Sequence, residues 1–130
     1  LIMNEHEAKL VGDAYGVDST DKPDFVRTLG ARFNLVPVVT MGPDGSMAYV
    51  DGEVIHVSSL DIKAVDTIGA GDAHAGYLCA ALDQGMSFQD AFIRASIAGS
   101  LTCTKIGAQS ALPDLDEVLK HKESLQLNTL

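Results

Sequence analysis

The stretch Asp66-Thr67-Ile68-Gly69-Ala70-Gly71-Asp72 decides how the rest of this 130-residue chain is interpreted. Two glycines bracket a turn that leads into an alanine-rich segment, and an aspartate stands at each end. Glycine lets backbone amides approach a ligand without interference from a Cβ atom. A helix that begins here would aim its unpaired N–H groups and its positive dipole end at one point, which suits a phosphate. The stretch therefore predicts a phosphate cradle with Asp72 in the first helical turn beside it.

The same residues also have a purely structural interpretation. A Gly-Ala-Gly turn before a helix often only allows close packing. An aspartate in the first turn can simply complement the helix dipole, which is worth about 0.3–1 kcal/mol at an exposed site. Both interpretations stay open on the residue pattern alone.

The composition bounds the class of protein. With 46% hydrophobic and 21% charged residues, the chain has the size and balance of one folded domain. Nine Lys and Arg against 18 Asp and Glu give a formal net charge of −9. Because a nucleic-acid surface needs a basic patch, we expect no nucleic-acid partner. No apolar run approaches the roughly 20 residues that span a bilayer, and no secretory signal is visible, so we expect a cytoplasmic protein without membrane association.

The spacing of the cysteines and histidines indicates neither a CxxC motif nor a zinc site. Cys79 and Cys103 lie far apart without a CxxC pair, which is typical of two reduced thiols. The four histidines show no HxxH or HExxH spacing, so nothing supports a zinc site. The opening residues Leu1-Ile2-Met3 resemble the end of a buried strand. We therefore expect a piece of a longer protein.

The first half of the chain reads as strands alternating with helices. A strand end at Leu1–Met3 enters a helix for which Asn4 is the expected N-cap and Glu7 the reciprocal partner of a capping box. A turn-rich stretch follows, then a second helix and a β-branched run typical of a strand buried on both faces of a parallel sheet. An Asp-Gly pair next predicts a hairpin. These elements are expected at Val11–Thr20, Asp21–Phe33, Leu35–Met41, and Ser46–Val50 with Glu53–Val57.

The second half reads as mainly helical. Two helical segments follow Asp72, separated by Gln84-Gly85-Met86, and Ser87 with Asp90 makes a capping signal for the second. A loop over Lys105–Pro113, a last helix over Asp114–Glu123 and a frayed tail over Ser124–Leu130 complete the expected order. Alternating strands and helices predict an α/β layered fold, whose ligands gather at the carboxyl ends of the strands.

Four motifs in this order resemble the ribokinase-like (PfkB) carbohydrate kinase family. Asp66–Asp72, followed by Ala73 and Gly76, resembles its C-terminal signature. The other three are its Asn-x-x-Glu motif, its Val-Thr-x-Gly-x-x-Gly nucleotide loop and its closing Gly-Ala…Pro segment; they correspond to Asn4–Glu7, Val39–Gly45 and Ile106–Pro113. The resemblance implies a ribokinase-like α/β fold, mainly parallel sheet flanked by helices. Residues 1–130 would be the C-terminal nucleotide-binding and catalytic part of a larger kinase domain.

The family resemblance also implies roles for individual residues. Asp72 would be the general base that takes the proton from the acceptor hydroxyl as it attacks the γ-phosphate of ATP. Gly69, Ala70 and Gly71 would supply amides to an anion hole for the transferring phosphoryl group. Asp66 would bind a monovalent cation such as K⁺, together with carbonyls of the 102–111 region.

Further residues would serve the nucleotide and Mg²⁺. Asn4 and Glu7 would act in the Mg²⁺ and phosphate environment through water, since Mg²⁺ keeps much of its hydration shell. Their structural alternative is an ordinary helix cap. Thr40, Gly42 and Gly45 would line the nucleotide, although Gly42–Gly45 otherwise reads only as a turn.

Two positions depart from the family pattern. His74 stands where the family commonly has phenylalanine, and a packed or surface histidine is the expectation there, with no catalytic role. Ser96 stands where several members use asparagine near the adenine, so it becomes the candidate beside the base while nucleotide preference stays open.

The expected function is ATP-dependent phosphoryl transfer to a hydroxyl of a sugar, with ATP, Mg²⁺ and in some members K⁺ as cofactors. The alternatives are a nucleoside kinase of the same fold and a non-catalytic regulatory descendant. The expected partners are small molecules, with a homodimer as an option for the full-length protein. The sugar-binding half is expected to lie outside these residues, so we expect the 130 residues alone to be inactive.

Overall fold

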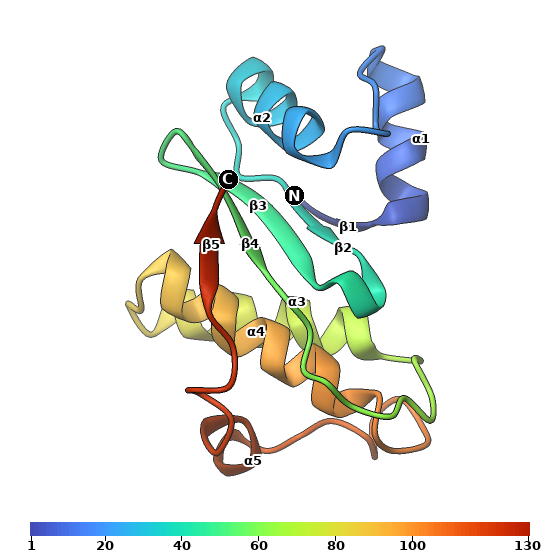
Figure 1. Ribbon diagram of the computed structural model, residues 1–130, viewed down its shortest axis with the longest axis vertical. Helices are drawn as coiled ribbons and strands as arrows, with labels where there is room; N and C mark the ends of the chain where they lie inside the picture. Colours follow the sequence, from blue (N-terminus) through green and yellow to red (C-terminus); the bar gives the residue numbers. More distant parts are fainter. The chain divides into compact units, whose positions relative to one another are not determined.

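The computed structural model describes residues 1–130, which fold into two compact units. The first unit comprises Leu1–His56 with Asn128–Leu130, and the second comprises Val57–Leu127. The strands lie mainly in the first unit together with two helices, whereas the second unit is mainly helical (Figure 1). No helix has the length and apolar character needed to cross a membrane.

A five-stranded sheet organises the first unit. Its strands follow one another in the sheet in the same order as in the chain. β1 and β2 run parallel, whereas β2 and β3 run antiparallel. The strands are β1 (Ile2–Asn4), β2 (Val38–Thr40), β3 (Ser46–Val50), β4 (Glu53–Val57) and β5 (Leu127–Thr129). The expected strand at 35–41 is therefore present but shorter, because Pro37 has no N–H to donate to the ladder.

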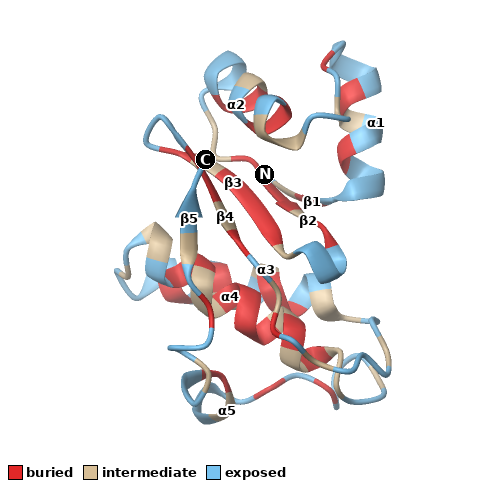
Figure 2. Ribbon diagram, in the orientation of Figure 1, coloured by how far each residue is buried: buried red, intermediate tan, exposed pale blue.

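Helices α1 (Glu5–Tyr15) and α2 (Lys22–Phe33) pack against this sheet. The register places Met3 beside Val39 and Val39 beside Met47, so the three side chains form one row on one face. They belong to the same buried cluster as the helix residues Ala8, Phe25, Val26 and Leu29. Buried residues accordingly line the strands and the sheet-facing sides of both helices (Figure 2).

The helix boundaries in this unit follow local chemistry. Asn4 caps α1 and Asp21 caps α2, each through a side-chain oxygen that accepts from an amide of the first turn. The turn-rich stretch expected at Val11–Thr20 begins later, since α1 continues to Tyr15 and is followed by its C-cap Gly16, which has φ +66°. The helix passes through Gly12 because that glycine is a packing position, where an added Cβ would collide with the carbonyl of Val17.

The hairpin between β3 and β4 forms as expected. Asp51 has φ +51° and Gly52 has φ +86°, the two positive values that a tight two-residue turn requires. The expectation of a frayed tail was wrong. The last residues instead form β5, and the N–H of Leu130 donates to the carbonyl of Val54 at 2.9 Å. An open strand edge carries unpaired N–H and C=O groups, and the tail supplies partners for those of β4.

The second unit consists of α3 (Ala70–Asp83), α4 (Phe88–Thr102) and α5 (Leu115–Leu119). α3 and α4 make extensive contact through small residues. At Gly99 of α4, an added Cβ would lie 3.3 Å from the carbonyl oxygen of Ala70 and 3.5 Å from Cβ of His74. The cap at Ser87 is confirmed, since its hydroxyl accepts from the N–H of Asp90 at 3.1 Å. α5 is shorter than the helix expected at 114–123 and ends at Leu119.

Candidate active site

The N-terminus of α3 is left open for an anion. Gly69 is its N-cap with φ +83°, and no side chain caps the first turn. The other four α-helices each have a side-chain cap, supplied by Asn4, Asp21, Ser87 and Asp114. Since the first amides of a helix have no partner within it, α3 keeps N–H groups and a positive dipole end available to a ligand.

The amides of the glycine turn differ in their availability. The N–H of Ala70 donates to the carbonyl of Thr67 at 3.3 Å, whereas those of Gly69 and Gly71 have no acceptor in the chain. Asp72 follows at the third helical position and is exposed. Its carboxylate makes no hydrogen bond or ion pair with another residue. The helix start therefore combines two amides that have no acceptor in the chain with a free carboxylate, whereas the amide of Ala70, also expected in the anion hole, is already in use.

Asp66 ties this turn to the loop that follows α4. One carboxylate oxygen accepts from the N–H of Ile68 at 3.0 Å, and the other accepts from the N–H of Gly107 at 3.2 Å. The bond from Ile68, and then that from Gly107, lower the pKa of Asp66, so this carboxyl is ionised at neutral pH. The amide N–H of Asp66 in turn donates to the carbonyl of Cys103 at 3.3 Å. Asp66 thus carries a fixed negative charge whose structural role is to join two segments.

The loop from Lys105 to Pro113 lies directly against the glycine turn. A Cβ added at Gly69 would lie 3.2 Å from the carbonyl oxygen and 3.3 Å from Cα of Ala108. Together with the bond between Gly107 and Asp66, this contact brings the Gly-Ala motif onto the Asp66–Asp72 signature. Two of the four motifs therefore meet within the second unit.

The other two motifs meet within the first unit. Asn4 and Thr40 are register partners at the ends of β1 and β2. Asn4 and Glu7 form a complete capping box: the N–H of Asn4 donates to Oε2 of Glu7 at 2.8 Å, and the N–H of Glu7 donates to Oδ1 of Asn4 at 2.8 Å. The structural interpretation of this pair as a helix cap is confirmed. Because both residues are exposed at the strand ends, the cap also presents the Glu7 carboxylate there.

The Thr40–Gly45 segment is a compact turn after β2. Residues Gly42–Asp44 form a 3₁₀ turn, with φ +56° at Gly42 and +87° at Gly45. The N–H of Met41 donates to the carbonyl of Gly45 at 2.8 Å. A ring nitrogen of His56, Nε2, lies 2.8 Å from the carbonyl oxygen of Asp44 and so braces the turn from β4. His56 was missed from the sequence, since nothing in its spacing relates it to the turn 12 residues earlier.

Ser96 and His74 lie in the packed part of the second unit. Ser96 is 6% exposed, and its hydroxyl donates to the carbonyl of Phe92 one helical turn earlier at 2.9 Å. His74 is 3% exposed and meets the ring of Phe92 edge to face at 5.7 Å. Burial lowers the pKa of His74 to about 4, so its imidazole is neutral at physiological pH. Of the packed and surface positions that the sequence left open for His74, the structure shows the packed one.

We expect His74 to make the protein sensitive to acid. Its folded pKa of about 4 lies below the ordinary 6.5, so the unfolded chain binds the proton first. Stability is therefore fully present above pH 6.5, falls between about pH 6.5 and 4, and loses at most about 3 kcal/mol to this group. His74→Phe should flatten that part of the pH dependence when urea unfolding of the full-length protein is measured across the range. The exposed-site control His6→Phe should follow the wild type, and parallel curves for His74→Phe and wild type would contradict the assignment.

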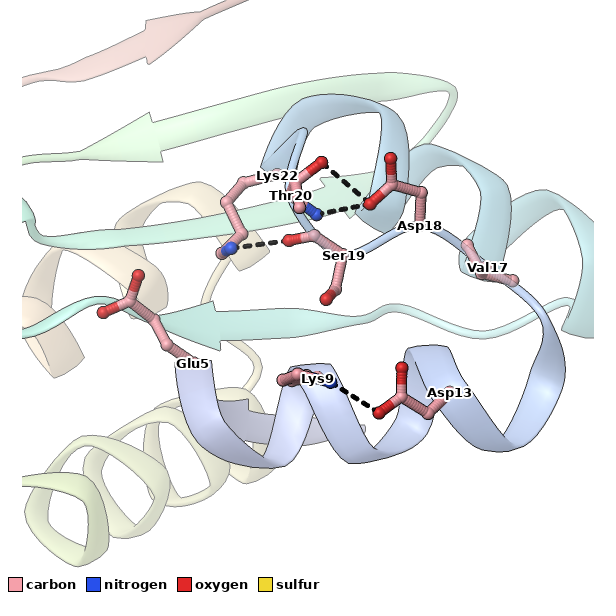
Figure 3. A pocket seen from close by; sticks show the side chains of 8 residues that line it. All are labelled: Glu5, Lys9, Asp13, Val17, Asp18, Ser19, Thr20 and Lys22. Atoms are coloured by element: carbon pink, nitrogen blue, oxygen red, sulfur yellow. Dashed lines mark hydrogen bonds and ion pairs between the residues drawn. The ribbon is translucent and has the colours of Figure 1, made fainter.

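A surface hollow of about 340 Å³ lies elsewhere in the first unit, between α1 and the start of α2 (Figure 3). It contains none of the residues that the sequence singled out. Most of its charged groups bond to other residues of the hollow: Lys9 pairs with Asp13 at 2.7 Å, and Asp18 accepts from the N–H and hydroxyl of Thr20. The hollow is thus a junction between helices, and the candidate functional residues remain those of the glycine turn in the second unit and those of the strand-end motifs in the first.

Comparison with known proteins matches this geometry. Residues 1–115 match the family described as pfkB family carbohydrate kinase. The ribokinase of Lactococcus lactis subsp. lactis (strain IL1403) is 35% identical over 129 residues, which cover 98% of this chain and 40% of that protein. The adenosine kinase of Schizosaccharomyces pombe is 38% identical over 96 residues, which cover 65% of this chain and 28% of that protein.

A solved structure agrees as well. The crystal structure of ribokinase from Cryptococcus neoformans var. grubii in complex with ADP matches with a TM-score of 0.83 and 30% identity, covering 93% of this chain and 42% of that one. The ribokinase-like fold expected from the sequence is therefore confirmed, and the chain spans less than half the length of these proteins. With its four motifs in order and its signature turn opening an uncapped helix, the chain belongs to the pfkB family of carbohydrate kinases.

Proposed function

We propose that the protein containing this chain transfers the γ-phosphoryl group of ATP to a hydroxyl of a sugar. Residues 1–130 would form the C-terminal nucleotide-binding and catalytic part of that kinase. The observation that carries the proposal is the open N-terminus of α3, where free amides and the free carboxylate of Asp72 occur together. Phosphoryl transfer needs mostly positioning and charge neutralisation, and this helix start offers both.

The reaction would use the glycine turn as follows. Asp72 would accept the proton of the acceptor hydroxyl as its oxygen attacks the γ-phosphorus and the bond from that phosphorus to the bridging oxygen of ADP breaks. The amides of Gly69 and Gly71 would hold the oxygens of the phosphoryl group in transit, with the dipole of α3 behind them. Ala70 would contribute less, because its N–H already donates to Thr67.

The nucleotide would be held by backbone groups and a few short side chains. Gly42 and Gly45 both have positive φ, and an added Cβ at Gly42 would meet nothing within 4 Å, so a ligand can approach the backbone of the turn there. The crystal structure of the Cryptococcus neoformans ribokinase is a complex with ADP, which supports an adenine nucleotide as a ligand of this fold. For Ser96, donation of a hydrogen bond to the base would first require its hydroxyl to leave the carbonyl of Phe92.

Mg²⁺ fits this chain only as a hydrated ion. No three His, Cys, Asp or Glu side chains come together that could hold a metal by themselves. Glu7 offers one carboxylate oxygen beyond the one used in its cap, which suits an ion that keeps several waters and takes phosphate oxygens. When bound, Mg²⁺ would neutralise charge on the transferring phosphates. Asn4 would keep Glu7 oriented through the capping box.

We expect Glu7→Gln to raise the Mg²⁺ concentration that gives half-maximal activity by about tenfold, because removing one charge from a metal environment commonly lowers affinity 10–100-fold. The amide oxygen of glutamine can still accept from the N–H of Asn4, so the melting temperature should change by only a few degrees. Glu5→Gln removes the same charge from the same helical turn and is the matched control. Equal Mg²⁺ requirements in the two variants would assign Glu7 to the cap alone.

A monovalent cation such as K⁺ would bind near Asp66. Two backbone N–H groups stabilise the ionised carboxylate of Asp66, so a fixed negative charge lies beside the backbone of the 102–111 segment, whose carbonyl oxygens could serve as further ligands. An ionised carboxylate and carbonyl oxygens are the donor types that hard cations take. Activity measured in K⁺ against activity in a large organic cation at equal ionic strength tests this assignment.

The acceptor is tested with the full-length protein. ATP and Mg²⁺ are supplied with ribose, fructose or adenosine, and acceptor-dependent formation of ADP is measured. A sugar acceptor is favoured by the 35% identity to the Lactococcus lactis ribokinase over nearly the whole chain. The identity of 38% to an adenosine kinase over a shorter stretch makes a nucleoside the second candidate. Absence of ADP formation with every acceptor would favour a non-catalytic descendant.

A further inference from the structure

We propose that Tyr77 is a positioning residue that holds the 105–113 loop against the phosphate turn, an inference that rests on the proposed function of that turn. Its hydroxyl donates to the carbonyl of Pro113 at 2.7 Å across 36 residues of sequence. Through this bond α3 holds the loop at Pro113, while Ala108, earlier in the same loop, contacts Gly69. The consequence is that nucleotide binding depends on a hydroxyl outside all four motifs.

The placement of Tyr77 on α3 makes this geometry specific. Gly69, Ala73 and Tyr77 are spaced by four residues, so they follow one another along one face of the helix. Gly69 and Tyr77 are therefore about 12 Å apart along the axis, at 1.5 Å per residue. The loop contacts this face twice, with Ala108 at Gly69 and Pro113 at Tyr77.

The segment of the loop between those two contacts is only slightly longer than the distance it has to cover along α3. Five residue steps separate Ala108 from Pro113, and a fully extended chain covers at most about 17 Å in that number of steps. Part of this length is taken up by a turn, since the N–H of Leu112 donates to the carbonyl of Gln109 at 3.3 Å. A displacement at Pro113 is therefore transmitted to Ala108, which lies 3.2 Å from the position of a Cβ on Gly69.

The other contacts that tie the loop to its surroundings are few and lie at its start. Gly107 donates to Asp66 at 3.2 Å, and Lys105 pairs with Glu117 of α5 at 2.9 Å. The residues from Ala108 to Ser110 are exposed, and Ile106 is 75% exposed. Ala111 and Pro113 are buried at the end that Tyr77 holds. Burial and the nearby carboxylates of Asp114 and Glu117 raise the pKa of Tyr77, so its hydroxyl stays protonated and can donate.

Tyr77→Phe in the full-length protein tests the inference, because it removes only the hydroxyl. We expect the Kd for ADP, measured by calorimetry, and the KM for ATP to rise about two- to tenfold, the range of a lost hydrogen bond. Hydrogen exchange of the amides at 107–112 should quicken without ligand, while exchange in the middle of α4 stays unchanged. Tyr15→Phe removes the same atom from an exposed tyrosine of α1 and should alter neither quantity.

The outcomes separate the two proposals. Wild-type protein that binds no ADP would overturn the proposed function, and the exchange of 107–112 would still show whether Tyr77 holds the loop. Wild-type affinity for ADP in Tyr77→Phe, or unchanged exchange at 107–112, would overturn the role of Tyr77. If Tyr77→Phe does not fold, Glu117→Gln is used instead. This variant weakens the ion pair with Lys105 but keeps an acceptor for the N–H of Asp114. It should weaken ADP binding in the same direction, and unchanged binding contradicts the inference.

Discussion

Replacing Asp72 with asparagine in the full-length protein is expected to lower kcat by roughly 10²–10⁴, the contribution typical of general base catalysis. Asparagine has the same shape but cannot take a proton from the acceptor hydroxyl. The amides of Gly69 and Gly71 stay in place, because no side chain of the first turn takes part in a cap. The KM for ATP should therefore change by less than about threefold, since the lost interaction belongs to the transition state.

Asp83→Asn is the matched control for Asp72→Asn. Asp83 is the exposed last residue of the same helix, so the same substitution is made 11 positions away on α3. Asp83→Asn should retain wild-type kcat and KM. Steady-state kinetics with the accepted substrate, together with ADP binding, measure both variants. Turnover unchanged in Asp72→Asn would remove Asp72 as the base and would favour a non-catalytic use of the anion site.

The parts of the fold that were predictable from sequence are those with local causes. The capping box at Asn4 and Glu7 and the cap at Ser87 depend on residues three apart, and all formed as expected. The hairpin at Asp51-Gly52 likewise follows from two residues that accept positive φ. The turn at Gly69 was predictable for the same reason, since its positive φ before the helix depends on the residue at that position.

What the sequence could not show depends on partners far away in the chain. The tail became β5 because β4 has an edge to pair, and neither segment signals the other. His56 supports the turn at Asp44 and Tyr77 holds Pro113 through single hydrogen bonds across 12 and 36 residues. A lone histidine or tyrosine in a periodic segment has no feature that distinguishes such a bond from ordinary packing.

The role of Ser96 was hard to predict because its side chain is buried and bonds within its own helix. Ser96 sits at a position that the family resemblance links to the adenine, yet in the structure its hydroxyl bonds back to its own helix. Serine readily makes such a bond to the carbonyl four residues earlier. The hydroxyls of Ser100 and Thr102 also donate to carbonyls four residues earlier in α4, so the bond made by Ser96 is a common one in this helix. Whether it turns toward a base depends on a ligand and not on the local sequence.

Replacing Gly69 with alanine is expected to lower kcat/KM by roughly 10², the size of effect seen when an oxyanion donor or a reacting group is misplaced. Two physical causes act together. Gly69 has φ +83°, which for an L residue is strained by about 1–2 kcal/mol. The new Cβ would also lie 3.2 Å from the carbonyl oxygen of Ala108, so the turn or the loop must shift. Either shift moves the amides that hold the phosphoryl group.

Gly85→Ala separates these two causes. Gly85 has φ +81°, almost the same backbone strain, but an added Cβ would meet nothing within 4 Å. Both variants should therefore lose similar stability from the backbone, whereas only Gly69→Ala should lose phosphoryl transfer. Thermal unfolding and kcat/KM are measured on both. Equal kinetic losses would attribute the effect to weakened folding of the second unit, while a loss confined to Gly69→Ala would show that the contact between Gly69 and Ala108 keeps the anion site in its working geometry.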